Sequence, residues 1–347
     1  MNKAEVLKRA HTLERISGVD LRGAVFQNED LPGMIFDGVD FSAARFHACS
    51  LRESVFTDCN FTESVFEQVD ISHAKFVGCQ FRQAVLEGCV LSEATFDESV
   101  FQRAAFRDCR AEQADLIDCD FSGATLRGIV LLECNVFSTR FEGADFTDAD
   151  LSKSTLHELD LQETIFTRAV MRQMALSGCT LSNQTFAGQD LSETQFNEAE
   201  LSGVDFSGCR MTMCNFSDAE LVDVDFSGAQ MRNTLFVGAT IQKTRFVGAT
   251  LPQSLWNNVL ATDSSFAGAE LSMSVFNRGS FQRCNFTGCD LQFADFSYAG
   301  LLDCRLDDVA LNRTRFHRAV LDSEDIKRRP GAVERDDELF EAELRSA

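Results

Sequence analysis

Every fifth residue from Ile16 to Leu321 is large and apolar, and this rhythm constrains the fold more than any other feature of the sequence. Only Ala111 and Ala261 depart from it among 62 consecutive positions, and no insertion shifts the register. Neither the 3.6-residue period of a helix nor the two-residue period of a strand gives a repeat of five over such a length. The sequence therefore predicts one repeat array, in which short segments wind into a solenoid.

A second period of 20 residues runs through the same apolar positions. One column avoids Phe and reads Leu31, Leu51, Ile71 and Leu91, whereas another column is built from Phe41, Phe61, Phe81, Phe101, Phe121 and Phe141. Like residues recur at this spacing when they stack on one another in successive coils. Four five-residue segments are therefore expected to close one coil.

Many five-residue segments share one pattern: a small residue, a polar residue, Leu or Phe, and then two polar residues. Residues 144–148, 149–153 and 224–228 show it clearly, and they resemble the repeats of the pentapeptide repeat family. The resemblance covers almost nine tenths of the chain. It implies an all-β solenoid, a right-handed quadrilateral β-helix of about 15 coils, with short helical caps at the termini.

The places within a segment have separate physical roles. The central residue and the small residue two places before it are expected to point inward, because a narrow coil has room for one large and one small side chain per wall. All 13 cysteines occupy the small inward place, so we expect buried free thiols rather than zinc ligands or disulfides. Of the 21 glycines, 18 occupy the last place, where the chain turns onto the next wall. Trp256 takes a Phe place and is predicted to lie in the core.

The sequence divides into residues 1–15 as an N-terminal capping helix, residues 16–326 as the β-helix, and residues 327–347 as a C-terminal tail. Asn2 followed by Glu5 resembles a capping box, and the stripe that follows predicts a helix over about residues 3–14. The apolar residues of that stripe are Val6, Leu7, Ala10 and Leu13. This segment is too polar for a secretory signal, and no stretch is apolar enough to span a membrane, so we expect a cytoplasmic protein.

The C-terminal tail is charged but contains four apolar residues that could lie on one face of a short helix. These residues are Val333, Leu339, Phe340 and Leu344. Two interpretations of an ordered tail stay open. The helix caps the last coil, or it pairs with its copy in a second chain to form a homodimer, as C-terminal elements do in related family members that dimerise. A disordered tail is the third.

The net charge of −22 excludes ordinary nucleic-acid binding, which needs clustered Lys and Arg. Some pentapeptide repeat proteins resemble a DNA duplex in size, shape and charge, and they bind DNA gyrase or topoisomerase IV and modulate the action of quinolones or toxins. The matching acidic surface here would comprise Asp97, Glu98, Asp115 and Asp118 on one wall and Asp160, Glu163, Glu200, Glu220 and Asp223 on another. These acids are dispersed, and the array lacks the interrupting loops usual in quinolone-protection proteins, so DNA mimicry is the alternative hypothesis.

Apolar residues at outward places are the better indication of function, because contiguous exposed apolar patches often mark interaction surfaces. The candidate patch comprises Leu235, Leu255 and Val275 on one wall, Val237 beside Leu235, and Met273 and Phe293 on the adjacent wall. We therefore favour a rigid, non-catalytic interaction scaffold or adaptor that binds protein partners through its outer walls. Family members also occur beside bacterial secretion machinery and as secreted effectors.

Catalysis has little support in the sequence. The five histidines are scattered, so no Ser-His-Asp or Cys-His arrangement is predicted. The run of Asp145, Asp148 and Asp150 lacks the glycine and the distal Glu of a calcium loop. A core filled with Phe offers no cavity for a substrate. We expect no enzyme activity, no cofactor and no metal.

Overall fold

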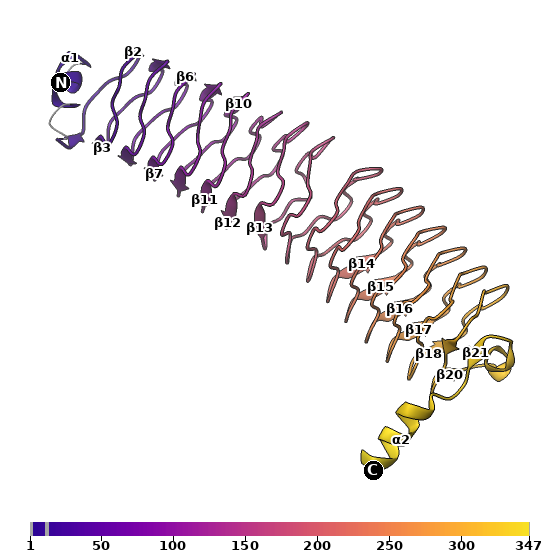
Figure 1. Ribbon diagram of the computed structural model, residues 1–347. Coiled ribbons are helices and arrows are strands. Elements are labelled where there is room, and N and C mark those ends of the chain that lie inside the picture. The colour runs from indigo at the N-terminus through magenta and orange to yellow at the C-terminus, as the bar shows by residue number, and fades with distance from the viewer. Residues whose placement is uncertain (1–2, 11–13, 347) are drawn as a thin grey trace. The chain divides into compact units, whose positions relative to one another are not determined.

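The computed structural model describes residues 3–10 and 14–346, and these divide into two compact units, residues 1–175 and 176–347. Both units are β-solenoids with 20 residues per coil, which confirms the predicted fold class (Figure 1). The division after residue 175 was not predicted, because the five-residue register of the sequence continues through it.

In the first unit, short strands stack in parallel on two walls of the coil (Figure 1). Partners lie 20 residues apart, as Phe56 and Phe76 do. One wall carries an eight-stranded sheet of β1 (Ile16–Ser17), β3 (Ile35–Asp37), β5 (Val55–Thr57), β7 (Lys75–Val77), β9 (Thr95–Asp97), β11 (Asp115–Ile117), β12 (Asn135–Phe137) and β13 (Thr155–His157). The other carries β2 (Val25–Gln27), β4 (Arg45–His47), β6 (Val65–Glu67), β8 (Val85–Glu87) and β10 (Ala105–Arg107).

In the second unit, a six-stranded parallel sheet covers one wall. Its strands are β14 (Glu220–Val222), β15 (Thr240–Gln242), β16 (Leu260–Thr262), β17 (Ser280–Gln282), β18 (Gly300–Leu302) and β20 (Val320–Leu321). A second sheet has two strands, β19 (Thr314–Arg315) and β21 (Ala332–Val333). The remaining walls pair through single parallel bridges, again 20 residues apart, as between Asp205 and Asp225.

The core consists of columns of stacked rings. The rings of Phe56 and Phe76 have centroids 4.7 Å apart and are nearly parallel, at 2°. Rings on adjacent walls meet edge to face, as Phe56 and Phe61 do at 5.4 Å. Both geometries suit the charge distribution of an aromatic ring, and Phe has no polar atom that would need a buried partner. The Phe columns of the sequence are therefore stacks of rings.

Trp256 is fully buried in such a column, as predicted. Its ring stacks on that of Phe236, with centroids 4.0 Å apart. Because the indole N–H must be satisfied when it is buried, it donates to Ser254 Oγ over 2.7 Å. Ala261, one of the two exceptions to the large apolar rhythm, occupies the next central place and leaves room for the larger ring.

The small inward place holds the cysteines, and all 13 are free thiols, as predicted. Twelve are buried, whereas Cys304 in one of the last coils is half-buried. Burial raises the pKa of Cys214 to about 12, because an apolar environment disfavours the thiolate. These side chains fill the core, and most of them are poor nucleophiles.

The last place of each segment forms the corner, and the backbone there is left-handed. Gly208 has a φ of 64° and Gly288 a φ of 70°, which confirms the predicted role of glycine. The same conformation recurs where the corner holds Asp, Asn, Glu or Gln, as at Asp218 (57°). Asp and Asn tolerate this conformation better than other non-glycine residues do. The corner therefore selects small or polar residues.

The polar residue before each central residue also has a structural role. Asp205 Oδ1 accepts the backbone N–H of Ser207 over 2.9 Å, and Asp225 Oδ1 accepts that of Ser227 over the same distance. This local turn satisfies an N–H that the coil leaves free. The frequent Asp at this place is thus explained by the backbone.

Short helices lie at both ends of the chain. Helix α1 (Lys3–Ala10) buries Val6 completely. It is shorter than the predicted helix over residues 3–14, and Asn2, His11 and Leu13 lie outside the described residues. At the other end, the 3₁₀ helix η1 (Glu324–Arg328) buries Ile326.

Candidate protein-interaction surface

Leu235, Leu255 and Val275 lie on successive coils of the second unit, and we call these three residues the apolar ladder. Parallel bridges pair Leu235 with Leu255 and Leu255 with Val275. Each side chain is half-buried, because neighbours at the spacing of β-strands shield one another. The structure thus brings together the residues that the sequence placed on one wall.

The corners beside the apolar ladder carry two larger apolar side chains. Met273 is 52% exposed and Phe293 is 44% exposed, whereas Val237 is half-buried. Met273 and Phe293 have φ values of 58° and 61°, so both adopt the left-handed corner conformation. This conformation costs a residue with a Cβ roughly 1–2 kcal/mol. The fold therefore gives no reason for bulky apolar residues at these corners.

The surface around the apolar ladder contains no acidic residue over three coils. Residues 231–238, 251–258 and 271–278 include neither Asp nor Glu, although the chain has 54 acids among 347 residues. The charged residues of these segments are Arg232 and Arg278. A strongly acidic protein thus has one apolar and locally cationic face.

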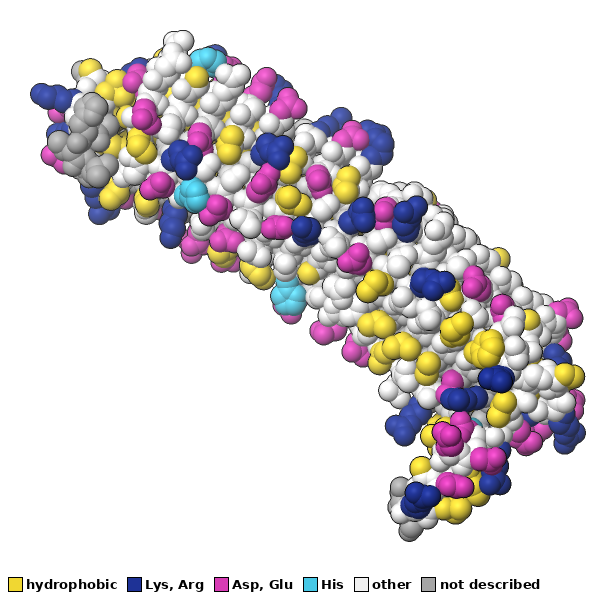
Figure 2. All heavy atoms as spheres, viewed as in Figure 1, with side chains coloured by type: hydrophobic (Ala, Val, Ile, Leu, Met, Phe, Trp, Pro, Cys, Tyr) yellow, Lys and Arg dark blue, Asp and Glu magenta, His cyan; other side chains and the backbone are white. Residues whose placement is uncertain are grey.

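Hydrophobic side chains gather over the coils that carry β15–β18, on the face of the second unit seen in Figure 2. Beyond the apolar ladder, Phe293 lines a shallow hollow of about 580 Å³. The hollow is completed by Arg313, Arg315, Val333 and the residues from 335 to 338. The apolar surface therefore continues towards the C-terminal segment.

The C-terminal segment packs on its own chain. Val333 lies in β21, where it pairs with Arg315 of β19, so it is not part of the helix that the sequence predicted. Helix α2 (Asp337–Ser346) contains the other three apolar residues of that prediction. Leu339 and Phe340 are half-buried, whereas Leu344 is 65% exposed.

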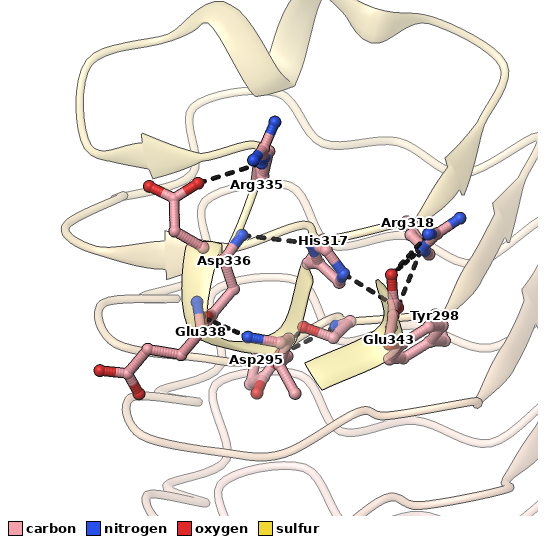
Figure 3. A network of polar contacts seen from close by, with 11 residues as sticks. Asp295, Tyr298, His317, Arg318, Arg335, Asp336, Glu338 and Glu343 are labelled. Atoms are coloured by element: carbon pink, nitrogen blue, oxygen red, sulfur yellow. Dashed lines mark hydrogen bonds and ion pairs between the residues drawn. The ribbon is translucent and has the colours of Figure 1, made fainter. Parts of the chain in front are cut away.

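Asp336 begins the attachment of α2 to the coils (Figure 3). Its Oδ1 accepts the backbone N–H groups of Glu338 and Leu339, over 3.1 and 3.2 Å, and so caps the helix. Its own N–H donates to His317 Nδ1 over 3.1 Å, and its Oδ2 lies 3.4 Å from Arg315 Nε.

Glu343 completes the attachment. Figure 3 shows Tyr298, His317 and Arg318 pointing toward its carboxylate. His317 Nε2 lies 3.2 Å from Oε1, and Arg318 Nε lies 2.9 and 2.7 Å from the two oxygens. The Tyr298 hydroxyl also donates to Oε1. The sequence analysis missed this cluster, although residues 298 and 318 are 20 apart and so share a corner.

The cluster shifts two pKa values. Hydrogen bonds from Arg318, Tyr298 and His317 lower the pKa of Glu343 to about 2, because they favour the charged carboxylate. The hydrogen bond to Glu343 raises the pKa of Tyr298, since ionised Tyr298 could not donate it.

The residues of the candidate acidic surface do not form one continuous stripe within either unit. Asp97, Glu98, Asp115, Asp118, Asp160 and Glu163 belong to the first unit, and Glu200, Glu220 and Asp223 belong to the second. Asp115 accepts a hydrogen bond from Asn135 on the next coil over 2.9 Å. Elsewhere, acids pair with arginines 20 residues away, as Asp225 does with Arg245 over 2.8 Å.

Among residues 3–10 and 14–346, no three His, Cys, Asp or Glu side chains lie together so that they could hold a metal ion. The described histidines pair with single glutamates, as His47 does with Glu67 over 3.1 Å. Within the described part of the chain, no helix has the length and apolar character needed to cross a bilayer.

Stacked coils without a described metal cluster, and with an apolar outer face, define a β-solenoid of the repeat-protein class. The family model "Pentapeptide repeat region" matches residues 29–99, 59–137, 184–256 and 209–280, which together exceed half of the chain. A second model, "Pentapeptide repeats (8 copies)", matches residues 134–173 and 264–299. The chain therefore belongs to the pentapeptide repeat family.

Similar solved structures belong to the same fold. Trypsin-treated QnrB1, a plasmid-mediated fluoroquinolone resistance protein, is 19% identical, with a TM-score of 0.37 over 55% of this chain and 88% of that chain. HetL, involved in heterocyst differentiation regulation in the cyanobacterium Nostoc sp. strain PCC 7120, is 19% identical, with a TM-score of 0.18 over 90% and 96%. Rfr23 from the cyanobacterium Cyanothece 51142 is 14% identical, with a TM-score of 0.19 over 59% and 97%.

These similarities indicate no function for this chain, because their identities and TM-scores are low. No curated protein shows significant sequence similarity to it.

Proposed function

We propose that this protein is a rigid, non-catalytic scaffold that binds a protein partner through the apolar ladder and the corners beside it. The observation that supports this most is the acid-free apolar face over residues 231–278 of a chain with a net charge of −22. Contiguous apolar surface is unfavourable in water and is retained where a partner covers it.

The bulky corners give independent support. Met273 and Phe293 occupy a left-handed conformation that Gly or Asn adopts at lower cost. Their side chains stay largely outside the core, so they contribute little to packing. An aromatic or Met side chain on a rigid wall is a typical anchor in protein interfaces.

A binding role also suits the rest of the molecule. The core is filled, and the thiols are buried, so the outer walls are what the protein offers to other molecules. The free thiols fit a reducing compartment, and we place the protein in the cytoplasm on that basis.

DNA mimicry is the alternative, and the net charge of −22 favours it. The pairing of acids with arginines on neighbouring coils weakens it, because a paired carboxylate presents less negative potential. A gyrase supercoiling assay separates the two functions. Inhibition or protection from a quinolone supports the mimic, and no effect supports the scaffold.

The scaffold is tested by Leu255→Glu, which puts a charge in the middle of the apolar ladder. Partners are captured from the source cells by cross-linking to the wild type, to Leu255→Glu and to Val247→Glu. Val247 is 42% exposed and lies outside the three acid-free segments, so Val247→Glu is the matched control. We expect a partner that the wild type and the control retain and that Leu255→Glu loses at least tenfold. Equal capture by all three chains would contradict the proposal.

A further inference from the structure

Three donors on neighbouring coils converge on one carboxylate of α2. Tyr298 and Arg318 occupy equivalent corners, and the backbone N–H of Tyr298 donates to the carbonyl of His317 over 2.8 Å. Tyr298, His317 and Arg318 all point toward Glu343 (Figure 3). A hydroxyl, an imidazole N–H and a guanidinium together form a complete donor set for a carboxylate.

The donor at the centre of this set is fixed in advance. His317 is 2% exposed, and its Nδ1 accepts the N–H of Asp336. Because Nδ1 accepts a hydrogen bond, the proton of the neutral ring is on Nε2, which faces Glu343. Asp336 is in turn held by Arg315, so this orientation does not require Glu343.

The occupant, in contrast, is weakly attached. Helix α2 has ten residues, a length at which an isolated helix is marginal in water. Its two half-buried apolar residues are Leu339 and Phe340, and the Phe340 ring is covered by Arg335 of the same segment, 3.7 Å from the ring centroid. Attachment therefore depends strongly on Glu343.

The donor set also lies next to the apolar ladder. Val275 pairs with Asp295, and Asp295 pairs with Arg315, so the ladder column runs into the coils that hold Tyr298 and His317. Arg278, on the coil of Val275, lies 6.0 Å from the centroid of the Tyr298 ring. A segment lying along the ladder would bring its next residues to these donors.

We propose that Tyr298, His317 and Arg318 form a binding site for a carboxylate side chain of a protein partner, and that Glu343 occupies this site as an internal competitor. The proposal rests on the proposed function, because it defines the chemistry of the partner on the same face. The partner carries apolar residues that cover the apolar ladder, followed by a Glu or Asp that displaces α2.

The test opens the site in the full-length chain by Glu343→Lys, which sets a cation against Arg318. Glu341→Lys is the matched control, because Glu341 is exposed on α2 and its side chain pairs with Arg345. The probe is a fluorescent peptide with the sequence of residues 337–346, followed by anisotropy. We expect the Glu343→Lys chain to bind it at least tenfold more tightly than the wild type and the Glu341→Lys chain do.

Two further measurements identify the ligand. Replacing the peptide glutamate that corresponds to Glu343 by Gln, or adding Arg318→Ala to the opened chain, is expected to weaken binding at least tenfold. Free glutamate at the peptide concentration is expected not to compete, and competition would show a small-molecule site instead. Equal peptide binding by the three chains, or no binding, would overturn the proposal. The effect of Leu255→Glu on partner capture is measured separately, so the scaffold function would survive that result.

Discussion

The hydroxyl of Tyr298 donates a hydrogen bond to Glu343, which follows it by 45 residues, and this contact joins the coils to α2. Tyr298 is the single tyrosine of the chain, so its ionisation can be followed without interference from another phenol. The contact raises the pKa of Tyr298 above its usual value of 10.0.

The first prediction concerns the alkaline titration of Tyr298. Its folded-state pKa is raised, so the stability it contributes is present below the unfolded pKa of about 10 and is lost as the pH rises through the folded pKa. We expect Glu343→Gln to lower the pKa of Tyr298 towards 10, measured by tyrosinate absorbance. The control is Glu341→Gln, which should titrate as the wild type does. Identical pKa values in all three chains would show that α2 does not contact Tyr298.

The second prediction concerns acid. The pKa of Glu343 is lowered from 4.5 to about 2, so its contribution is present above the unfolded pKa and is lost as the pH falls through the folded one. We expect the amides of residues 337–346 to lose hydrogen-exchange protection between about pH 4.5 and 2. Glu343→Gln should lack protection of α2 already at neutral pH. Protection that is unchanged in this window would contradict the role of Glu343.

The sequence predicted the coils well and the C-terminal contacts poorly, for physical reasons. Each coil contacts its neighbours at a fixed spacing of 20 residues, so the columns of Phe61 or Leu255 can be read from the sequence. The partners of α2 follow no period. Glu343 meets Tyr298 and His317 only because η1 and β21 turn the chain back onto its last coils.

The role of the corners was predicted only in part. Glycine marks 18 of them in the sequence, but the left-handed backbone is also present at residues such as Asp218 and Phe293. Propensity alone does not reveal such positions, because the hydrogen bonds of the neighbouring coils impose the conformation. The apolar ladder could be located from the sequence, whereas the cost of placing Phe293 at its corner required the structure.

The third prediction uses the stack around Phe206. This ring lies between Phe186 and Phe226, with centroids 5.5 and 5.2 Å away, and is fully buried. Phe206→Ala should lower the free energy of unfolding by about 3–5 kcal/mol, because it leaves a cavity as well as losing apolar burial. Ser207→Ala is the control and should change it by less than about 0.5 kcal/mol, since Asp205 accepts the backbone N–H of Ser207. Chemical denaturation of each variant provides the measurement, and a loss of under 1 kcal/mol for Phe206→Ala would show a poorly packed column.

The fourth prediction concerns the two alanines that interrupt the rhythm. Ala111 lines an enclosed apolar void of about 10 Å³, together with residues such as Phe101 and Leu131. Ala261 instead follows Trp256 in its coil and pairs with Phe281 on the next. We expect Ala111→Leu to raise the free energy of unfolding by about 0.5–2 kcal/mol and Ala261→Leu to lower it by about 1–3 kcal/mol, because filling a void stabilises a core and overpacking strains it.

A compensating variant separates overpacking from other causes at the second alanine. Adding Trp256→Phe to Ala261→Leu restores the ring size found elsewhere in the column, as at Phe236 and Phe276. The double variant should therefore be more stable than Ala261→Leu alone, although Trp256→Phe alone should lose stability because it vacates space and leaves Ser254 without its indole donor. Additive effects in this double-mutant cycle, measured by thermal and chemical denaturation, would mean that Ala261 does not compensate for Trp256.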